Sequence, residues 1–313
     1  MRTIDRASTL IAVFLLTFAS VGSLAGAAGV QAQMRSASRA ADAWPYIRLS
    51  VVVLDKSRDP NATLPASEFR VFEDGSERKV ESVSRQDSPM SVAFVIDTSG
   101  SMYKQGARVA TVVRTVVHAL PPGSEIAAIE FADTPHVEQA LAPVAGNTLA
   151  VLQHLDARGC TALLDGVLKA EALLAGQAHH ARRALVIVGD GGDNCSTQSL
   201  DEAVRAFQSP EAPSIYAFLL VPVVKLQPGP TEQGGRVMRA LVRFGGAVVF
   251  APRRDQEVAE SATKMAAIIR SQYLLDFTAA DAARDGRRHV LDVRVPIRNL
   301  LIFAIPSCFA PAD

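Results

Sequence analysis

The pattern of hydrophobic and polar positions changes twice along the chain. Residues 46–55 alternate and then run apolar, and residues 68–84 contain two strand-like runs around Asp74-Gly75. These patterns predict a β-strand followed by a β-hairpin. From residue 91 onwards, short apolar runs alternate with segments whose apolar residues recur every three or four positions. This second pattern predicts buried strands and amphipathic helices in alternation, which is typical of a mainly parallel sheet with helices on both faces.

The expected elements of this α/β region can be placed from the same pattern. The strands are expected at 91–97, 124–132, 183–190, 214–223 and 246–250. The helices are expected at 104–120, 163–174, 200–208, 235–244 and 255–270. After residue 270, β character returns at 271–279, 287–297 and 299–305.

These elements predict a Rossmann-like α/β domain over residues 89–270. The N-terminal β region, 44–88, and the C-terminal β region, 271–313, flank this domain and are expected to combine into a small β-sandwich.

The N-terminus has the pattern of a secretory signal peptide. Arg2 and Arg6 precede an apolar run over about 10–24, and small residues follow as far as Ala32. We expect residues 1–32 to be cleaved, 33–43 to be a disordered leader, and the protein to be exported to the periplasm or secreted. The alternative is an uncleaved anchor, which would be the chain's one contact with a membrane, but the run is short for crossing a bilayer.

Composition narrows the choice of partners. The chain has 32 basic and 32 acidic residues, so its formal net charge is zero. Nucleic-acid binding rests on clustered Lys and Arg, and this composition gives no electrostatic reason to expect it.

Oxygen-bearing side chains follow the predicted strands at three places. Asp97, Ser99 and Ser101 follow the first strand of the α/β domain, Thr161 precedes a helix, and Asp190 ends a later strand. Ligands of open α/β sheets sit at the carboxyl ends of strands, near the point where the strand order reverses. Two carboxylates and three hydroxyls suit a hard cation, so the sequence predicts a site for Mg²⁺, with Mn²⁺ or Ca²⁺ as alternatives.

Less specific interpretations exist for several of these residues. Ser99 and Ser101 alone could cap a helix or stabilise a turn. Asp193 is close to Asp190, but we expect it to be a solvated loop residue. His179 and His180 could bind a transition metal, although a solvated loop is the simpler interpretation.

Catalytic motifs do not fit the first cluster. A hydrolase elbow requires G-x-S-x-G, whereas Asp97 stands two residues before Ser99. A phosphoaspartate enzyme would have a second Asp where Ser99 stands, and a phosphate-binding P-loop would end in Gly-Lys-Ser/Thr. We therefore expect no enzyme activity.

The segments "DTSGS", "GCT" and "GDGGDN" together resemble the metal-ion-dependent adhesion site of von Willebrand factor type A (VWA) domains. The resemblance implies metal contact by Ser99, Ser101 and Thr161, with Asp97 and Asp190 bound directly or through water. The layout of residues 46–296 also resembles an exported VWA family best known from Acidobacteria. The final segment, 299–313, has no counterpart in that pattern.

The resemblance implies a protein-binding module that captures an Asp or Glu side chain of a partner protein through the cation. The alternative is a structural component of the cell envelope, in which the metal mainly stabilises the assembly.

The three cysteines are Cys160, Cys195 and Cys308. Cys160 directly precedes Thr161, and Cys195 lies five residues after Asp190. If both loops converge on one ion, the two sulfurs come within bridging distance, so we expect a Cys160–Cys195 disulfide and a free Cys308. The alternative is a pair of buried thiols.

Overall fold

The structure is a computed structural model. It describes residues 44–60, 64–85, 87–145, 157–209, 212–220 and 237–311, without residues 239, 242, 244, 247, 281–283, 285 and 298. The expected signal peptide at 1–32, the leader at 33–43 and part of the helix at 235–244 lie outside the described residues. No helix in the described ranges is long and apolar enough to cross a membrane.

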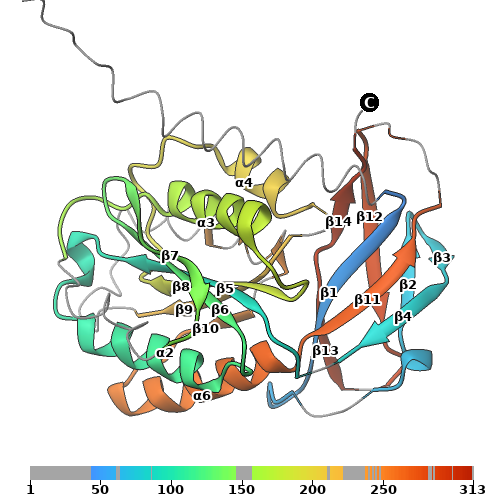
Figure 1. The fold of residues 1–313 in the computed structure, drawn as a ribbon, viewed down its shortest axis with the longest axis horizontal. Helices are drawn as coiled ribbons and strands as arrows, with labels where there is room; N and C mark the ends of the chain where they lie inside the picture. Colours follow the sequence, from blue (N-terminus) through green and yellow to red (C-terminus); the bar gives the residue numbers. More distant parts are fainter. Residues whose placement is uncertain are drawn as a thin grey trace, which may run out of the picture.

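A six-stranded sheet forms the centre of the α/β domain (Figure 1). Its strands are β5 (Ser91–Asp97), β6 (Glu125–Phe131), β7 (Pro135–Pro143), β8 (Arg183–Gly189), β9 (Ser214–Leu219) and β10 (Val248–Phe250). The order across the sheet is β10-β9-β8-β5-β6-β7. The edge strand β7 is antiparallel to β6, and all other neighbouring strands are parallel. The expected α/β fold with a mainly parallel sheet is confirmed.

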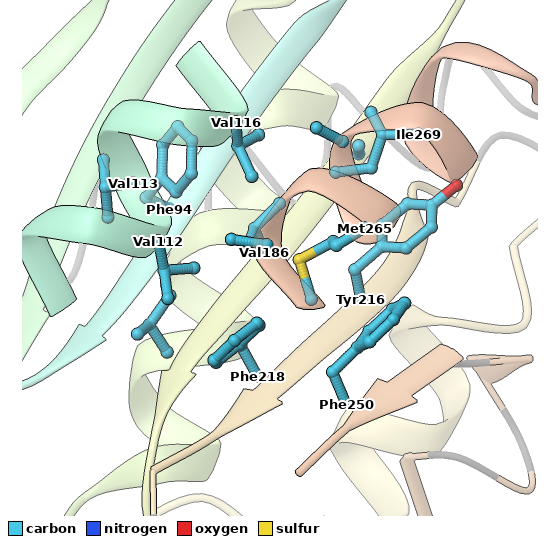
Figure 2. Close-up of a cluster of buried hydrophobic side chains, with 14 of the residues drawn as sticks. Phe94, Val112, Val113, Val116, Val186, Tyr216, Phe218, Phe250, Met265 and Ile269 are labelled. Atoms are coloured by element: carbon cyan, nitrogen blue, oxygen red, sulfur yellow. The ribbon is translucent and has the colours of Figure 1, made fainter. Parts of the chain in front are cut away.

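Helices cover both faces of this sheet (Figure 1). The helices are α2 (Gly106–Ala119), α3 (Leu163–Gln177), α4 (Leu200–Ala206) and α6 (Asp255–Arg270). Helices α2 and α6 share one core with the sheet, and α3 and α4 contribute to the core on the opposite face. Figure 2 shows the first core, where Phe94, Val186 and Phe218 of the sheet meet Val112 of α2 and Met265 of α6. This burial removes large apolar surfaces from water and fixes the sheet between its helices.

The N- and C-terminal β segments form two four-stranded sheets. Their elements are β1 (Tyr46–Asp55), η1 (Ala66–Glu68), β2 (Arg70–Glu73), β3 (Ser76–Arg78), β4 (Val80–Ser84), β11 (Tyr273–Thr278), β12 (Arg288–Arg294), β13 (Leu300–Phe303) and β14 (Ser307–Phe309). The strand orders are β13-β1-β11-β4 and β14-β12-β2-β3. Side chains from both sheets fill one shared core, so the segments from the two parts of the chain pack as a β-sandwich.

Strand β1 takes part in both halves of the molecule. Val51 and Val53 belong to the core of the sandwich, whereas Val52 and Leu54 belong to the core beneath α2 and α6. The run of consecutive apolar residues in β1 is explained by burial on both faces.

Arg182 also connects the two halves. Its guanidinium is buried and donates hydrogen bonds to the carbonyls of Ser88, Ile269 and Arg270. Ile269 and Arg270 end α6, where a cation interacts favourably with the helix carbonyls. These contacts tie the segment before β5 to the segment that leads into β11.

Two strands were not predicted. β7 is an exposed edge strand bounded by Pro135 and Pro143, and its polar residues give little alternation to detect. β14 contains Cys308 and pairs with β12, which gives the unplaced end of the chain a role in the sandwich. The expected hairpin at 68–84 consists of β2 and β3, and the next strand, β4, joins the other sheet through β11.

Candidate metal-ion site

The first loop of the site follows β5 directly. Asp97 ends the strand and is buried, and its Oδ1 accepts a hydrogen bond from the backbone N–H of Ser99 at 2.9 Å. Ser99 precedes the 3₁₀ helix η2 (Gly100–Met102), but its hydroxyl does not cap that helix in the described structure. The Ser99 and Ser101 hydroxyls instead lie 3.0 Å apart. The capping interpretation of Ser99 is therefore wrong, and the two hydroxyls are side by side.

The second loop, which precedes α3, is hydrogen-bonded to the first. The backbone N–H of Gly100 donates to Gly159 O at 3.2 Å, and that of Arg158 donates to Thr98 O at 2.9 Å. These bonds hold the buried Thr161 near the end of β5.

The third loop, which follows β8, meets both of the others. The N–H of Asp190 donates to Asp97 Oδ2 at 3.4 Å. The Thr161 N–H donates to Asn194 Oδ1 at 2.8 Å, and Asn194 N–H donates back to Thr161 O at 2.9 Å. A Cβ placed on Gly192 would lie 3.0 Å from Asp190 Oδ1 and 3.8 Å from Thr161 Oγ1, so both side chains flank this glycine.

The structure thus brings together Asp97, Ser99, Ser101, Thr161 and Asp190, which we call the oxygen cluster. The cluster lies at the carboxyl ends of β5 and β8. The chain adds β6 on one side of β5 and β8 on the other, so this is the point where the strand order reverses. The sequence predicted that these residues lie at this edge of the sheet. Metal binding by the five residues stays a prediction.

Without a cation, the negative charge of Asp97 is destabilised within the oxygen cluster. Burial, and secondarily the negative charge of Asp190, raise the pKa of Asp97 from 3.8 to about 6. Hydrogen bonds from Ser99 and from the Asp190 N–H oppose this rise only in part. A divalent cation would stabilise both carboxylates in their charged form. The hard oxygen donors therefore fit Mg²⁺, and Mn²⁺ or Ca²⁺ by the same argument.

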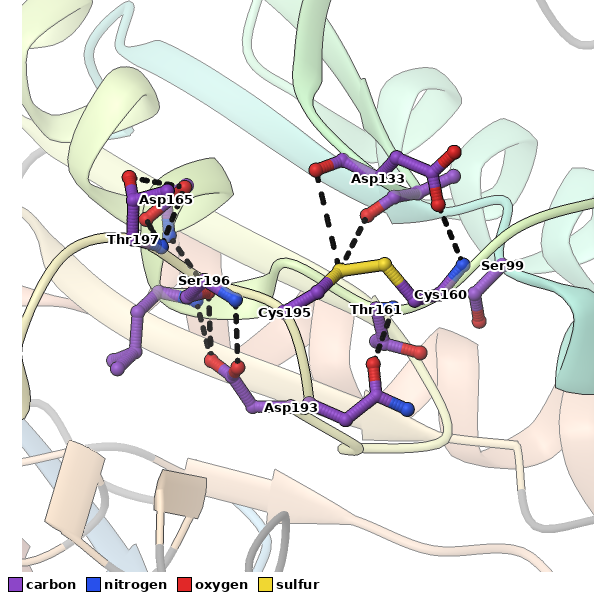
Figure 3. Close-up of a disulfide and its surroundings, with 12 residues drawn as sticks. Ser99, Asp133, Cys160, Thr161, Asp165, Asp193, Cys195, Ser196 and Thr197 are labelled. Carbon is purple, nitrogen blue, oxygen red and sulfur yellow. Dashed lines mark hydrogen bonds between the residues drawn. A yellow bond between two sulfur atoms is a disulfide. The ribbon is translucent and has the colours of Figure 1, made fainter.

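A disulfide joins the second and third loops. Cys160 and Cys195 are bonded, with their Cα atoms 6.2 Å apart, and Cys308 is a free, buried cysteine (Figure 3). The expected pairing is present. Cys195 Sγ also lies 3.8 Å from Ala132 O and 4.0 Å from Asp133 O. A disulfide sulfur carries no proton, so these are van der Waals contacts rather than hydrogen bonds.

Asp193 has a different role from the one expected. Its side chain is buried, and its Oδ2 accepts hydrogen bonds from the Leu164 N–H at 3.0 Å and from the Ser196 hydroxyl at 2.9 Å (Figure 3). The expectation of a solvated loop residue is wrong, because Asp193 satisfies a backbone donor in the first turn of α3. It thereby fixes the helix that follows Thr161.

The histidine pair lies away from the cluster, in the connection between α3 and β8. His179 Nδ1 lies 2.9 Å from Glu125 Oε2, and His180 Nε2 lies 3.1 Å from Gly123 O. Both histidines therefore have protein partners at the opposite end of the sheet.

Sequence reasoning missed two features beside the cluster. A pocket of about 240 Å³ opens next to Asp97 and includes Met102, Tyr103 and Lys104, and Tyr103 is 67% exposed. Asp133 accepts a hydrogen bond from the Cys160 N–H at 2.7 Å. Tyr103 and Lys104 lie just after Ser101 in the chain, but no motif marks them. Asp133 is brought to the site only by the folded loops.

Comparison with known proteins supports the fold. Residues 92–192 match the family model of the von Willebrand factor type A domain. No curated protein sequence matches the chain.

Several solved structures are similar at low sequence identity. The von Willebrand factor type A structure from Catenulispora acidiphila is 13% identical, with 85% of this chain and 74% of that chain covered and a TM-score of 0.48. The PilB minor pilin from Streptococcus sanguinis is 12% identical, with 60% and 63% covered and a TM-score of 0.45. BatB from Bacteroides thetaiotaomicron is 13% identical, with 58% and 100% covered and a TM-score of 0.44. This chain thus spans less than two thirds of the pilin structure. The segment from β5 to the loop after β8 is thus the part of this chain that matches the von Willebrand factor type A domain.

Proposed function

We propose that this protein is an exported, metal-dependent protein-binding module. Its oxygen cluster holds a divalent cation, Mg²⁺ in the first place, and the cation binds an Asp or Glu side chain of a partner protein. One observation supports the proposal above all others. Three loops are hydrogen-bonded to one another, and their two carboxylates and three hydroxyls lie together at the point where the strand order reverses.

The composition of the cluster supports capture of an acidic side chain. Three of its five side chains are neutral hydroxyls, which leave much of the ion's charge uncompensated. The ion would keep coordination positions for an incoming carboxylate, because Mg²⁺ retains exchangeable water when few protein ligands hold it. The pocket beside Asp97, with the exposed Tyr103 and Lys104, offers room for neighbouring parts of the partner.

Binding, rather than catalysis, fits the cluster's hydrogen bonds. The Ser99 hydroxyl has the Ser101 hydroxyl as its partner, and Asp97 accepts from the Ser99 backbone. A cation bound between these oxygens would suit this arrangement better than activation of a serine nucleophile would.

A second role is favoured by the electrostatics of the cluster. Because burial and Asp190 destabilise the charged form of Asp97, a bound cation would also stabilise the fold. In this alternative, the metal strengthens a permanent assembly of the cell envelope, and the β-sandwich makes the main contacts.

Thermal unfolding of the full chain in EDTA, Mg²⁺, Mn²⁺ and Ca²⁺ tests the cation site. A cation at 100 times its dissociation constant adds about 2.7 kcal/mol to the unfolding free energy. We expect this shift in the wild type and in Thr111→Ala, a matched control on α2, but not in Asp97→Asn or Thr161→Ala. Equal responses in all four proteins would exclude the oxygen cluster as the site.

Capture of a partner from the cell envelope distinguishes the two roles. A complex that Mg²⁺ restores after removal of EDTA supports the binding module. A complex that survives both EDTA and Asp97→Asn supports the structural role.

A further inference from the structure

We propose that Asp133, Cys160 and Cys195 form a second cation site, separate from the oxygen cluster, which becomes available when the disulfide is reduced. The ion would be thiophilic and divalent, with Zn²⁺ as the best match. The proposal does not depend on Mg²⁺ binding at the oxygen cluster.

The three side chains already have suitable positions. A carboxylate oxygen of Asp133 and the Sγ atoms of both cysteines all lie within 4.8 Å of one another. Ligand atoms on a tetrahedral zinc ion lie roughly 3.5 Å apart, given bonds of about 2.0–2.3 Å. Small side-chain rotations therefore suffice to place one ion among the three atoms once the sulfurs separate.

Hydrogen bonds keep the two cysteines together without help from the disulfide. Thr161 O accepts from the backbone N–H groups of both Asn194, at 2.9 Å, and Cys195, at 3.2 Å. The Thr161 N–H donates to Asn194 Oδ1 at 2.8 Å. Because these bonds flank both cysteines, reduction leaves two thiols facing each other and does not release two free loops.

Asp133 is held against the same pair by two independent features. Its Oδ1 accepts a hydrogen bond from the Cys160 N–H at 2.7 Å. It also packs against Gly159, where a Cβ would lie 2.4 Å from Asp133 Oδ1. Gly159 has φ = +75°, so a residue with a side chain would be strained here as well as in collision with the carboxylate.

Solvent can reach the site. Asp133 is exposed and both cysteines are half-buried, so a reductant and an ion can approach from the surface. Cys308, in contrast, is fully buried in the sandwich core, and burial raises the pKa of its thiol to about 12. Cys308 therefore serves as an internal control.

The disulfide is first reduced, and the metal ion binds in a second step. A dithiol or phosphine reductant supplies two electrons to the S–S bond, and two protons complete the Cys160 and Cys195 thiols while the reductant is oxidised. A divalent ion then replaces both thiol protons, which pass to solvent, and two thiolates and one carboxylate bind it. Thiolates favour Zn²⁺ over Mg²⁺, and a water molecule completes the tetrahedron.

Titration of the phosphine-reduced full chain with Co²⁺, a spectroscopic substitute for Zn²⁺, tests the proposal. We expect one equivalent of Co²⁺ to produce a thiolate-to-cobalt absorption band in the near ultraviolet, which one equivalent of Zn²⁺ removes and millimolar Mg²⁺ does not. Oxidised protein should give no band.

Variants assign the ligands. Cys308→Ala should keep the band and Cys160→Ser should lose the two-thiolate band, whereas Asp133→Asn should weaken binding at least about tenfold. The site is excluded if the reduced wild type gives no band, if the band follows Cys308, or if Asp133→Asn binds with unchanged affinity. Near-ultraviolet circular dichroism monitors the fold, and reduced protein that unfolds even with Zn²⁺ present would also overturn the proposal.

Discussion

Gly189 lies directly against Asp97. A Cβ placed on Gly189 would be 2.5 Å from Asp97 Cβ and 2.8 Å from its Oδ2. The last residue of β8 is therefore small because the carboxylate at the end of the neighbouring β5 occupies the space beside it.

Replacing Gly189 with Ala tests this contact. The new methyl group must displace Asp97, so we expect the unfolding free energy to fall by about 1–3 kcal/mol and the Mg²⁺-dependent shift in unfolding temperature to disappear. The control is Gly166→Ala, where a Cβ would meet core side chains of Phe131 and Val95 at 3.2–3.3 Å. This control should lose stability but keep its response to Mg²⁺. A Gly189→Ala protein with a normal response would show that Asp97 can move without loss of the site.

The disulfide should contribute to stability mainly through the unfolded chain. It links residues 35 positions apart, and closing a loop of that length is worth up to roughly 3–4 kcal/mol in the chain-entropy account. We expect Cys160→Ala/Cys195→Ala to unfold at correspondingly lower urea concentration. Adding a reductant should lower the midpoint of the wild type and leave that of the double variant unchanged. If the reductant lowered the midpoints of both proteins equally, its effect would come from another part of the chain and not from this disulfide.

Glu171 should make stability depend on pH. This residue is buried on α3, and burial raises its pKa from 4.5 to about 7, although Arg183 opposes the rise. The folded protein therefore holds the proton more tightly than the unfolded chain does. The resulting stabilisation is complete below pH 4.5 and is lost as the pH rises to about 7.

The matched variant is Glu171→Gln, which stays neutral. Relative to this variant, we expect the wild type to lose on the order of 3 kcal/mol of unfolding free energy between pH 4.5 and 8, at 1.36 kcal/mol per pKa unit. Urea unfolding at both pH values measures the difference. A constant difference would mean that Glu171 titrates normally in the folded state.

Arg182 should be important for the junction between the two halves. Arg182→Met would leave three carbonyls without this buried donor, so we expect a loss of about 3 kcal/mol or more. Arg182→Lys should lose less, because it keeps the charge but not the planar set of donors. Exposed Arg114 on α2 supplies the control, since Arg114→Met should be nearly neutral. Chemical denaturation of the three variants gives the comparison, and an Arg182→Met protein as stable as Arg114→Met would contradict it.

The buried strands could be predicted because they are runs of mainly apolar residues. β5 is buried at every position, and its sequence predicted both the strand and its end at Asp97. β7 was missed because an edge strand needs apolar residues on only one side, and its burial pattern alternates weakly between exposed and half-buried positions. Sequence periodicity therefore describes the centre of the sheet better than its edge.

At the site, features that depend on residues close in sequence could be predicted, and features that depend on distant residues could not. The residues of the oxygen cluster follow strands or precede a helix, so their positions could be inferred from the chain. Asp133 could not, because its approach to Cys160 depends on the left-handed backbone of Gly159 and on a hydrogen bond across 27 residues. The capping role of Asp193 was missed for a similar reason, since its partner, Leu164, is 29 residues away.

The position of β1 has a consequence for how the chain folds. Tyr46 to Val51 pair with β11, and Val52 to Asp55 pair with β13. Among the described strands, β1 thus has hydrogen-bond partners only from Tyr273 onwards. Pairings this distant in sequence carry a large loop-closure cost and slow folding. During synthesis, β1 therefore stays without its strand partners until β11 has been made, and a nascent chain that stalls before Tyr273 would be prone to aggregation.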